Sequence, residues 1–178
     1  LGLRDERLTA RQAADRYLSS ILCLRFYDSD EAVKNHEPTS NASAFLISAD
    51  GLAVTNCHSL EEVVAGTATL STGETVDIER VIYYDDAIDI AVLRLSRTTL
   101  DGTVIPAFHP IELAGTREVR AGDIVYAIGN PLGLGLAVSQ GIVGSTSHNA
   151  DLSSLPCLLS DATISRGSSG GVLLNEYG

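Results

Sequence analysis

The chain has 178 residues, a hydrophobic fraction of 44% and a formal net charge of −11, from 12 basic and 23 acidic side chains. This length allows one domain, or two small lobes that share one core. The acidic balance argues against nucleic acid and anionic lipid as partners, because both require basic patches. No apolar stretch is long enough to span a membrane. The chain begins with Leu1 and contains no Met. We therefore expect a processed or trimmed piece, with any targeting signal lost.

The first hundred residues predict a helix and then a run of strands. Thr9 followed by Gln12 is a capping-box pattern, and apolar residues at helical spacing predict a helix over 8–20. A polar loop is expected over 28–41, and Ser59 with Glu62 predicts a short capped helix directly after His58. Strands are predicted over 21–27, 44–47, 52–56, 63–70, 75–84 and 90–95, with a hairpin turn at Asp50-Gly51.

The second half repeats this layout without repeating the sequence. Residues 101–110 contain Gly102, Pro106 and Pro110, and they are the expected connection between two lobes. Further strands are predicted near 111–113, 124–128, 136–143, 155–160 and 171–174. Short strands at this spacing indicate an all-β sandwich or barrel. The expected organisation is therefore a helical segment at 1–20, a first β lobe at 21–100, the connection, and a second β lobe at 111–178.

Cysteines and most histidines give no sign of a metal site. The three cysteines are Cys23, Cys57 and Cys157. They cannot all pair within the chain and show no C-x-x-C spacing, so we expect mainly buried small hydrophobic residues. His36, His109 and His148 likewise lack metal-ligand spacing. We expect no cofactor and no metal.

The stretch around Ser169 carries the strongest indication of chemistry. Gly167 precedes this serine, and Gly170 and Gly171 follow it. Glycines let the backbone turn sharply and direct adjacent N–H groups at one point. A hydroxyl beside such donors suits acyl transfer, in which the serine attacks a carbonyl and the donors hold the oxyanion. A plain Gly/Ser turn is the alternative that this stretch alone leaves open.

Two upstream residues supply the partners that a nucleophilic serine needs. His58 follows a predicted hairpin, and Asp89 directly precedes an apolar strand. A histidine can take the serine proton, and a carboxylate can fix the tautomer of the imidazole. The pattern G-x-S-x-G around Ser169 also matches the elbow of α/β-hydrolases. That fold requires the order serine, acid, histidine, whereas every histidine here precedes Ser169.

Four blocks over residues 40–178 resemble the trypsin-like serine proteases of the HtrA/Deg family. They are 43–58 with its final Asn56-Cys57-His58, 85–93 around Asp89, 122–143 with Gly129-Asn130-Pro131, and 160–171 around Ser169. The resemblance implies a chymotrypsin-like double β-barrel with a short N-terminal helix. His58 and Asp89 would come from the first barrel and Ser169 from the second. The stretch Gly167-Ser168-Ser169 would form the oxyanion hole, with the N–H groups of Gly167 and Ser169 as its donors.

The resemblance also implies a pocket for the substrate side chain. A trypsin-type pocket places an acid six residues before the serine, where this chain has Thr163, with Ile164 beside it. We expect these two residues to bind substrate, and the uncharged floor to favour small or medium apolar side chains. The last hairpin of the family's second barrel would follow Gly178, so we expect that barrel to be incomplete in this chain.

The expected function is a serine endopeptidase that acts on unfolded or damaged proteins in a bacterial envelope or periplasm. The family often forms trimers, so the resemblance implies a homo-oligomer. Arg166 and Ser168 stand where proline and asparagine are usual, and Cys57 stands where asparagine is common. The departures at Arg166 and Ser168 leave open a weakly active or latent state. A catalytically silent binding scaffold or chaperone on the same fold is the alternative.

Overall fold

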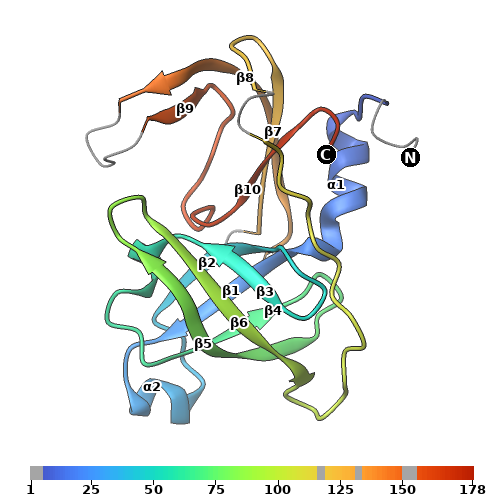
Figure 1. Cartoon of the computed structure of the whole chain (residues 1–178). Coiled ribbons are helices and arrows are strands. Elements are labelled where there is room, and N and C mark those ends of the chain that lie inside the picture. Colours follow the sequence, from blue (N-terminus) through green and yellow to red (C-terminus); the bar gives the residue numbers. More distant parts are fainter. Residues whose placement is uncertain (1–5, 116–118, 131–133, 150–155) are drawn as a thin grey trace.

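The computed structural model describes residues 6–115, 119–130, 134–149 and 156–178. Most of these residues lie in two β units with a short helix beside the second (Figure 1). The helices are α1 (Ala10–Tyr17), α2 (Asp30–Asn35) and the 3-10 turns η1 (Leu18–Ser20) and η2 (Cys57–Leu60). The strands are β1 (Ile21–Tyr27), β2 (Ser40–Leu46), β3 (Leu52–Thr55), β4 (Ala65–Thr69), β5 (Thr75–Asp85), β6 (Ile90–Thr99), β7 (Ile124–Gly129), β8 (Ala137–His148), β9 (Cys157–Ser160) and β10 (Val172–Asn175).

Strands β1 to β6 close into an antiparallel barrel in the order β1-β2-β3-β6-β5-β4. Closure leaves this unit without an unpaired strand edge. Inward-facing side chains such as Leu24, Phe26 and Leu93 are almost completely buried and form its core. The connection after β6 adds Ile105 and Phe108 to that core, so it is packed against the barrel rather than loose.

The second unit is a four-stranded antiparallel sheet in the order β10-β7-β8-β9. Its core contains Ile128 and Leu174 together with Ala13 of α1 and Ile21 at the start of β1. The helix therefore packs on the second sheet although it precedes the first barrel in sequence, as Figure 1 shows. A closed barrel plus a second β unit confirms the chymotrypsin-like fold expected from the sequence.

Local signals place most elements correctly. The capping box predicted at Thr9 and Gln12 is present in both directions, and it begins α1. The helix continues as η1 to Ser20, where the predicted helix also ends. None of the helices in the described ranges has the length and apolar content that a bilayer-spanning helix requires.

Three local predictions are wrong. The expected loop over 28–41 contains α2, which Ser29 caps by accepting a hydrogen bond from the Ala32 N–H. The segment 111–113 is not a strand, although the Ile111 N–H donates to the Leu46 carbonyl. The helical turn near His58 starts at Cys57 rather than after the histidine, and Asn56, not Ser59, occupies its N-cap position.

Candidate active site

His58 and Asp89 meet at one end of the first barrel. η2 presents His58 directly after β3, and Asp89 ends the turn that joins β5 to β6. The imidazole Nδ1 lies 2.7 Å from Asp89 Oδ2, and the His58 backbone N–H donates to Asp89 Oδ1 at 2.9 Å. Both side chains remain partly accessible, at 53% and 38% exposure. The carboxylate thus binds the backbone and the ring of the same histidine.

This geometry decides which nitrogen of His58 carries the proton. A carboxylate only accepts hydrogen bonds, so the Nδ1 that faces Asp89 must be the donor. In the neutral ring Nε2 is then unprotonated, and it lies 3.2 Å from Ser169 Oγ. Nε2 can therefore accept the hydroxyl proton, while Asp89 stabilises the imidazolium that results. The structure brings together the three residues that the sequence singled out.

The turn that carries Ser169 is shaped by two glycines in the left-handed region. Gly167 has φ of 84° and Gly170 has φ of 82°. A side chain at Gly170 would overlap the Ser43 carbonyl oxygen and the Thr55 hydroxyl, so the two β units approach each other here at backbone distance. Glycine is required at this position both for its φ and for its lack of a Cβ.

Hydrogen bonds hold several peptide groups of this turn. The Ser168 N–H donates to the Ser165 carbonyl, and the Gly171 N–H donates to the Ser168 carbonyl. No hydrogen-bond partner is found within the described residues for the N–H of Gly167 or of Ser169. These two donors are the ones expected for an oxyanion. Ser168, the middle residue of the expected hole, uses its own N–H within the turn.

Ser43 of β2 contributes to the site but has no signal of its own in the sequence. Its buried hydroxyl donates to the Gly167 carbonyl at 2.8 Å and accepts from the Asn130 N–H at 3.0 Å. Its backbone N–H donates to the Ser169 carbonyl at 2.8 Å. One residue of the first barrel thus holds two carbonyls of the serine turn. Only the pairing of the two units, which is a long-range property, identifies it.

Cys57 lies beneath the acid turn and is 2% exposed. Its thiol sulfur lies 2.9 Å from the Ile90 carbonyl oxygen and 3.2 Å from the Asp85 carbonyl oxygen, so its one S–H can donate to either; these two residues pair at the end of β5 and β6. Burial raises the pKa of the Cys57 thiol, and the nearby Asp89 carboxylate raises it further. The group is therefore a protonated donor at neutral pH. The expectation of a buried small residue is confirmed for Cys57 and Cys23, whereas Cys157 is half-buried.

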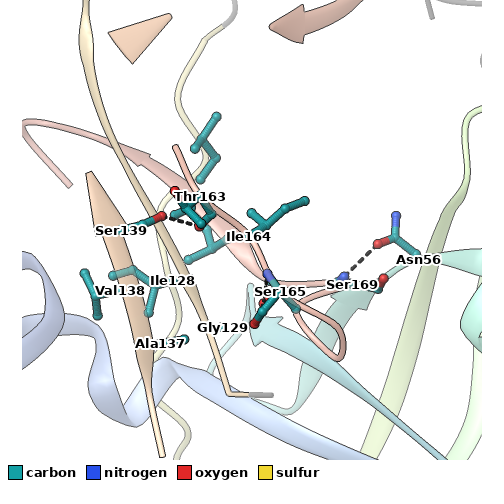
Figure 2. Close-up of a pocket in the computed structure, with 16 residues that line it drawn as sticks. Asn56, Ile128, Gly129, Ala137, Val138, Ser139, Thr163, Ile164, Ser165 and Ser169 are labelled. Carbon is teal, nitrogen blue, oxygen red and sulfur yellow. Dashed lines mark hydrogen bonds between the residues drawn. The ribbon is translucent and has the colours of Figure 1, made fainter. Parts of the chain in front are cut away.

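A cavity of about 560 Å³ opens beside Ser169 (Figure 2). Thr163 and Ile164, the two expected substrate-binding residues, lie on its wall, and Ile164 is 75% exposed. The Thr163 carbonyl accepts a hydrogen bond from Ser139 Oγ at 2.5 Å. Val138 and Ile128 also line the cavity, and the Ile128 side chain is almost completely buried in the core of the second sheet. None of the described residues that line it carries a charge.

Asp161 is near this cavity but is engaged elsewhere. Its Oδ1 accepts a hydrogen bond from the Ile142 N–H of β8 at 2.8 Å. This carboxylate therefore supports the β8 backbone and does not line the cavity. In the described part of the chain no group of three or more His, Cys, Asp or Glu residues could hold a metal ion.

Known proteins share both the sequence pattern and the fold. Residues 42–178 match a family model described as a trypsin-like peptidase domain. The chain is 31% identical over 175 residues to the serine endoprotease DegS of Haemophilus influenzae. This alignment covers 97% of this chain and 48% of DegS. It is 34% identical over 144 residues to a probable periplasmic serine endoprotease, DegP-like, of Rhizobium meliloti, covering 79% of this chain and 27% of that protein.

A solved structure of the HtrA-type protease AlgW with a tripeptide superposes with a TM-score of 0.80 at 25% identity. The superposition covers 96% of this chain and 52% of the AlgW chain. The chain thus spans about half or less of the length of these relatives.

Proposed function

The chain belongs to the HtrA family of trypsin-like serine proteases, and we propose that it is an endopeptidase whose catalytic residues are Ser169, His58 and Asp89. The observation that carries this proposal is the continuous contact from Asp89 Oδ2 to His58 Nδ1 and from His58 Nε2 to Ser169 Oγ, at 2.7 and 3.2 Å.

The reaction follows from this geometry. Ser169 Oγ attacks the carbonyl carbon of the scissile peptide as His58 Nε2 takes its proton, and the carbonyl oxygen becomes an oxyanion. The N–H groups of Gly167 and Ser169, which have no hydrogen-bond partner among the described residues, are the proposed donors to that oxygen. His58 then gives its proton to the leaving amine, and an acyl-enzyme remains on Ser169. Water, deprotonated by His58, releases the acid and restores the serine.

The cavity beside Ser169 is the proposed binding site for the side chain before the cleaved bond. Its described lining residues, among them Thr163, Ile164 and Val138, offer no counter-charge to Lys or Arg. Burying an unpaired charge is costly, so an apolar side chain of small or medium size is the preferred occupant. This supports the specificity that the resemblance implies.

The biological setting is a further part of the proposal. Relatives named as periplasmic endoproteases support an extracytoplasmic location, and the tripeptide in the similar structure supports polypeptide substrates. Unfolded or damaged proteins are the proposed substrates, because an extended chain can enter the site without first unfolding. Assembly into a trimer is proposed from the family resemblance alone.

The proposal is tested by cleavage of unfolded casein and of peptides with Val, Leu, Lys or Arg before the scissile bond. We expect cleavage after Val or Leu, and a loss of turnover on the order of a millionfold in Ser169→Ala with the fold intact. Cleavage by Ser169→Ala at the wild-type rate would refute the catalytic assignment. Binding of casein without cleavage by the wild type would favour the alternative of a latent scaffold.

A further inference from the structure

Asn56 contacts two segments that are remote from each other in the sequence. Its Oδ1 accepts a hydrogen bond from the Gly170 N–H at 2.6 Å (Figure 2). Its Nδ2 donates to the Asp89 backbone carbonyl at 2.8 Å. A primary amide is suited to this position because one planar group both accepts and donates. A single side chain thus touches the turn that carries the acid and the turn that carries the serine.

On the acid side, Asn56 binds a strained backbone. Asp89 has φ of 55°, in the left-handed region, which only a few per cent of residues other than glycine adopt and which Asp adopts more readily than most. Such a conformation persists only where the surroundings fix it. The Asn56 Nδ2–H holds the Asp89 carbonyl, while the Asp89 carboxylate faces His58. The direction of the Asp89 backbone therefore determines where its carboxylate meets the imidazole.

On the serine side, the peptide group between Ser169 and Gly170 is bonded at both ends. Its C=O accepts from the Ser43 N–H at 2.8 Å, and its N–H donates to Asn56. A peptide group is planar, so holding both ends restricts the plane and with it the backbone that carries the Ser169 side chain. The Ser169 Oγ to His58 Nε2 distance is already 3.2 Å. A small rotation of this plane would break that contact.

We propose that Asn56 is a positioning residue that couples the Asp89 turn to the Ser169 turn, so that both stay aligned on His58. Its role in catalysis rests on the proposed peptidase function, whereas the coupling of the two turns does not. Asn56 acts through its neighbours and transfers no proton itself. Removing it should therefore loosen both turns at once and slow attack by Ser169 without removing a reacting group.

The test combines two readouts in Asn56→Ala: amide hydrogen exchange at Gly170 and His58, and the rate of labelling by a fluorophosphonate. The His58 N–H is a probe of the acid turn because it donates to Asp89 Oδ1. We expect both amides to exchange about tenfold faster. Labelling per folded molecule should fall about 10- to 100-fold, as for small misplacements of reacting groups.

Thr99→Val is the matched control. Thr99 is a buried residue at the opposite end of β6 from Asp89, and its hydroxyl bonds to Asp101 and Thr103. Its loss should lower the melting temperature but leave both probe amides and the labelling rate unchanged. Equal labelling per folded molecule in Asn56→Ala and in this control would overturn the proposal, because Asn56 would then be structural only.

Asn56→Asp separates the two halves of the coupling and keeps the shape of the side chain. Its carboxylate can still accept from the Gly170 N–H but can no longer donate to the Asp89 carbonyl. We expect Gly170 to stay protected while His58 exchanges faster. Unchanged protection of His58 in both variants would overturn the coupling. If the wild-type chain is not labelled at all, the peptidase proposal fails, and the exchange of the two amides still decides the coupling.

Discussion

Gly170→Ala is a sharp test of how the two β units meet. At Gly170 a Cβ would overlap the Ser43 carbonyl oxygen and the Thr55 hydroxyl, and φ is 82°. A left-handed φ costs a residue other than glycine about 1–2 kcal/mol, and overpacking adds about 1–3 kcal/mol. The free energy of unfolding should fall by about 2–5 kcal/mol. For a chain of this size that lowers Tm by about 4–20 °C.

Gly102→Ala isolates the first of these costs. Gly102 has φ of 90°, but nothing lies within 4 Å of the position its Cβ would take. Its loss of stability should stay at about 1–2 kcal/mol, and labelling by a fluorophosphonate should be unchanged. Denaturant titration of both variants gives the comparison. Equal destabilisation of the two, or full labelling of Gly170→Ala, would refute the close approach of the units at Gly170.

Three further perturbations probe other contacts of the site and the fold. Ser43→Ala leaves the Gly167 carbonyl and the Asn130 N–H without their hydroxyl partner. The kcat of peptide cleavage should therefore fall about 10- to 100-fold, with KM unchanged. An unaltered kcat would show that the hydroxyl does not hold the turn. Hydrogen bonds from Ser48 and Arg94 lower the pKa of Asp50 in the folded chain. This contribution to stability is present above the ordinary carboxyl pKa of about 4 and is lost as pH falls through the folded value. Acid unfolding of Asp50→Asn should therefore depend less on pH than that of the wild type, and parallel curves would contradict this. Burial raises the pKa of the thiols of Cys23 and Cys57. A maleimide should therefore modify half-buried Cys157 first, and the other two cysteines only in denaturant. Rapid modification of all three cysteines in the folded chain would argue against the described packing.

The sequence predicted those parts of the fold that depend on neighbours along the chain. The Thr9 capping box and the Asp50-Gly51 turn are local hydrogen-bonding and backbone preferences, and both lie where expected. α2 was missed because its six residues are too few to show a helical period, although Ser29 at its cap and acidic residues in its first turn were visible. The turn at His58 was placed too late because Ser59 and Glu62 carry a local cap pattern, whereas the observed turn begins at Cys57 and has no side-chain cap hydrogen bond.

The candidate site likewise contains residues that the sequence identified and residues that it did not. His58, Asp89 and Ser169 were found because their residue types and order carry a chemical pattern, and the structure brings them into contact. Ser43 and Asn56 were not assigned a role. A serine or asparagine at such a position is ordinary, and its meaning depends on which distant backbone approaches it. The pairing of Ser43 with Gly167 joins residues 124 positions apart, and no local propensity encodes that contact.

The most direct test of the central claim is labelling of the chain with a fluorophosphonate, followed by mass spectrometry of the modified peptide. His58→Ala and Ser169→Ala serve as controls. The expected result is one adduct on Ser169 in the wild type and none in either variant, because only a serine whose proton is taken by His58 reacts rapidly. No adduct on the folded wild type, or equal labelling of His58→Ala, would contradict the assignment of Ser169 as a histidine-activated nucleophile.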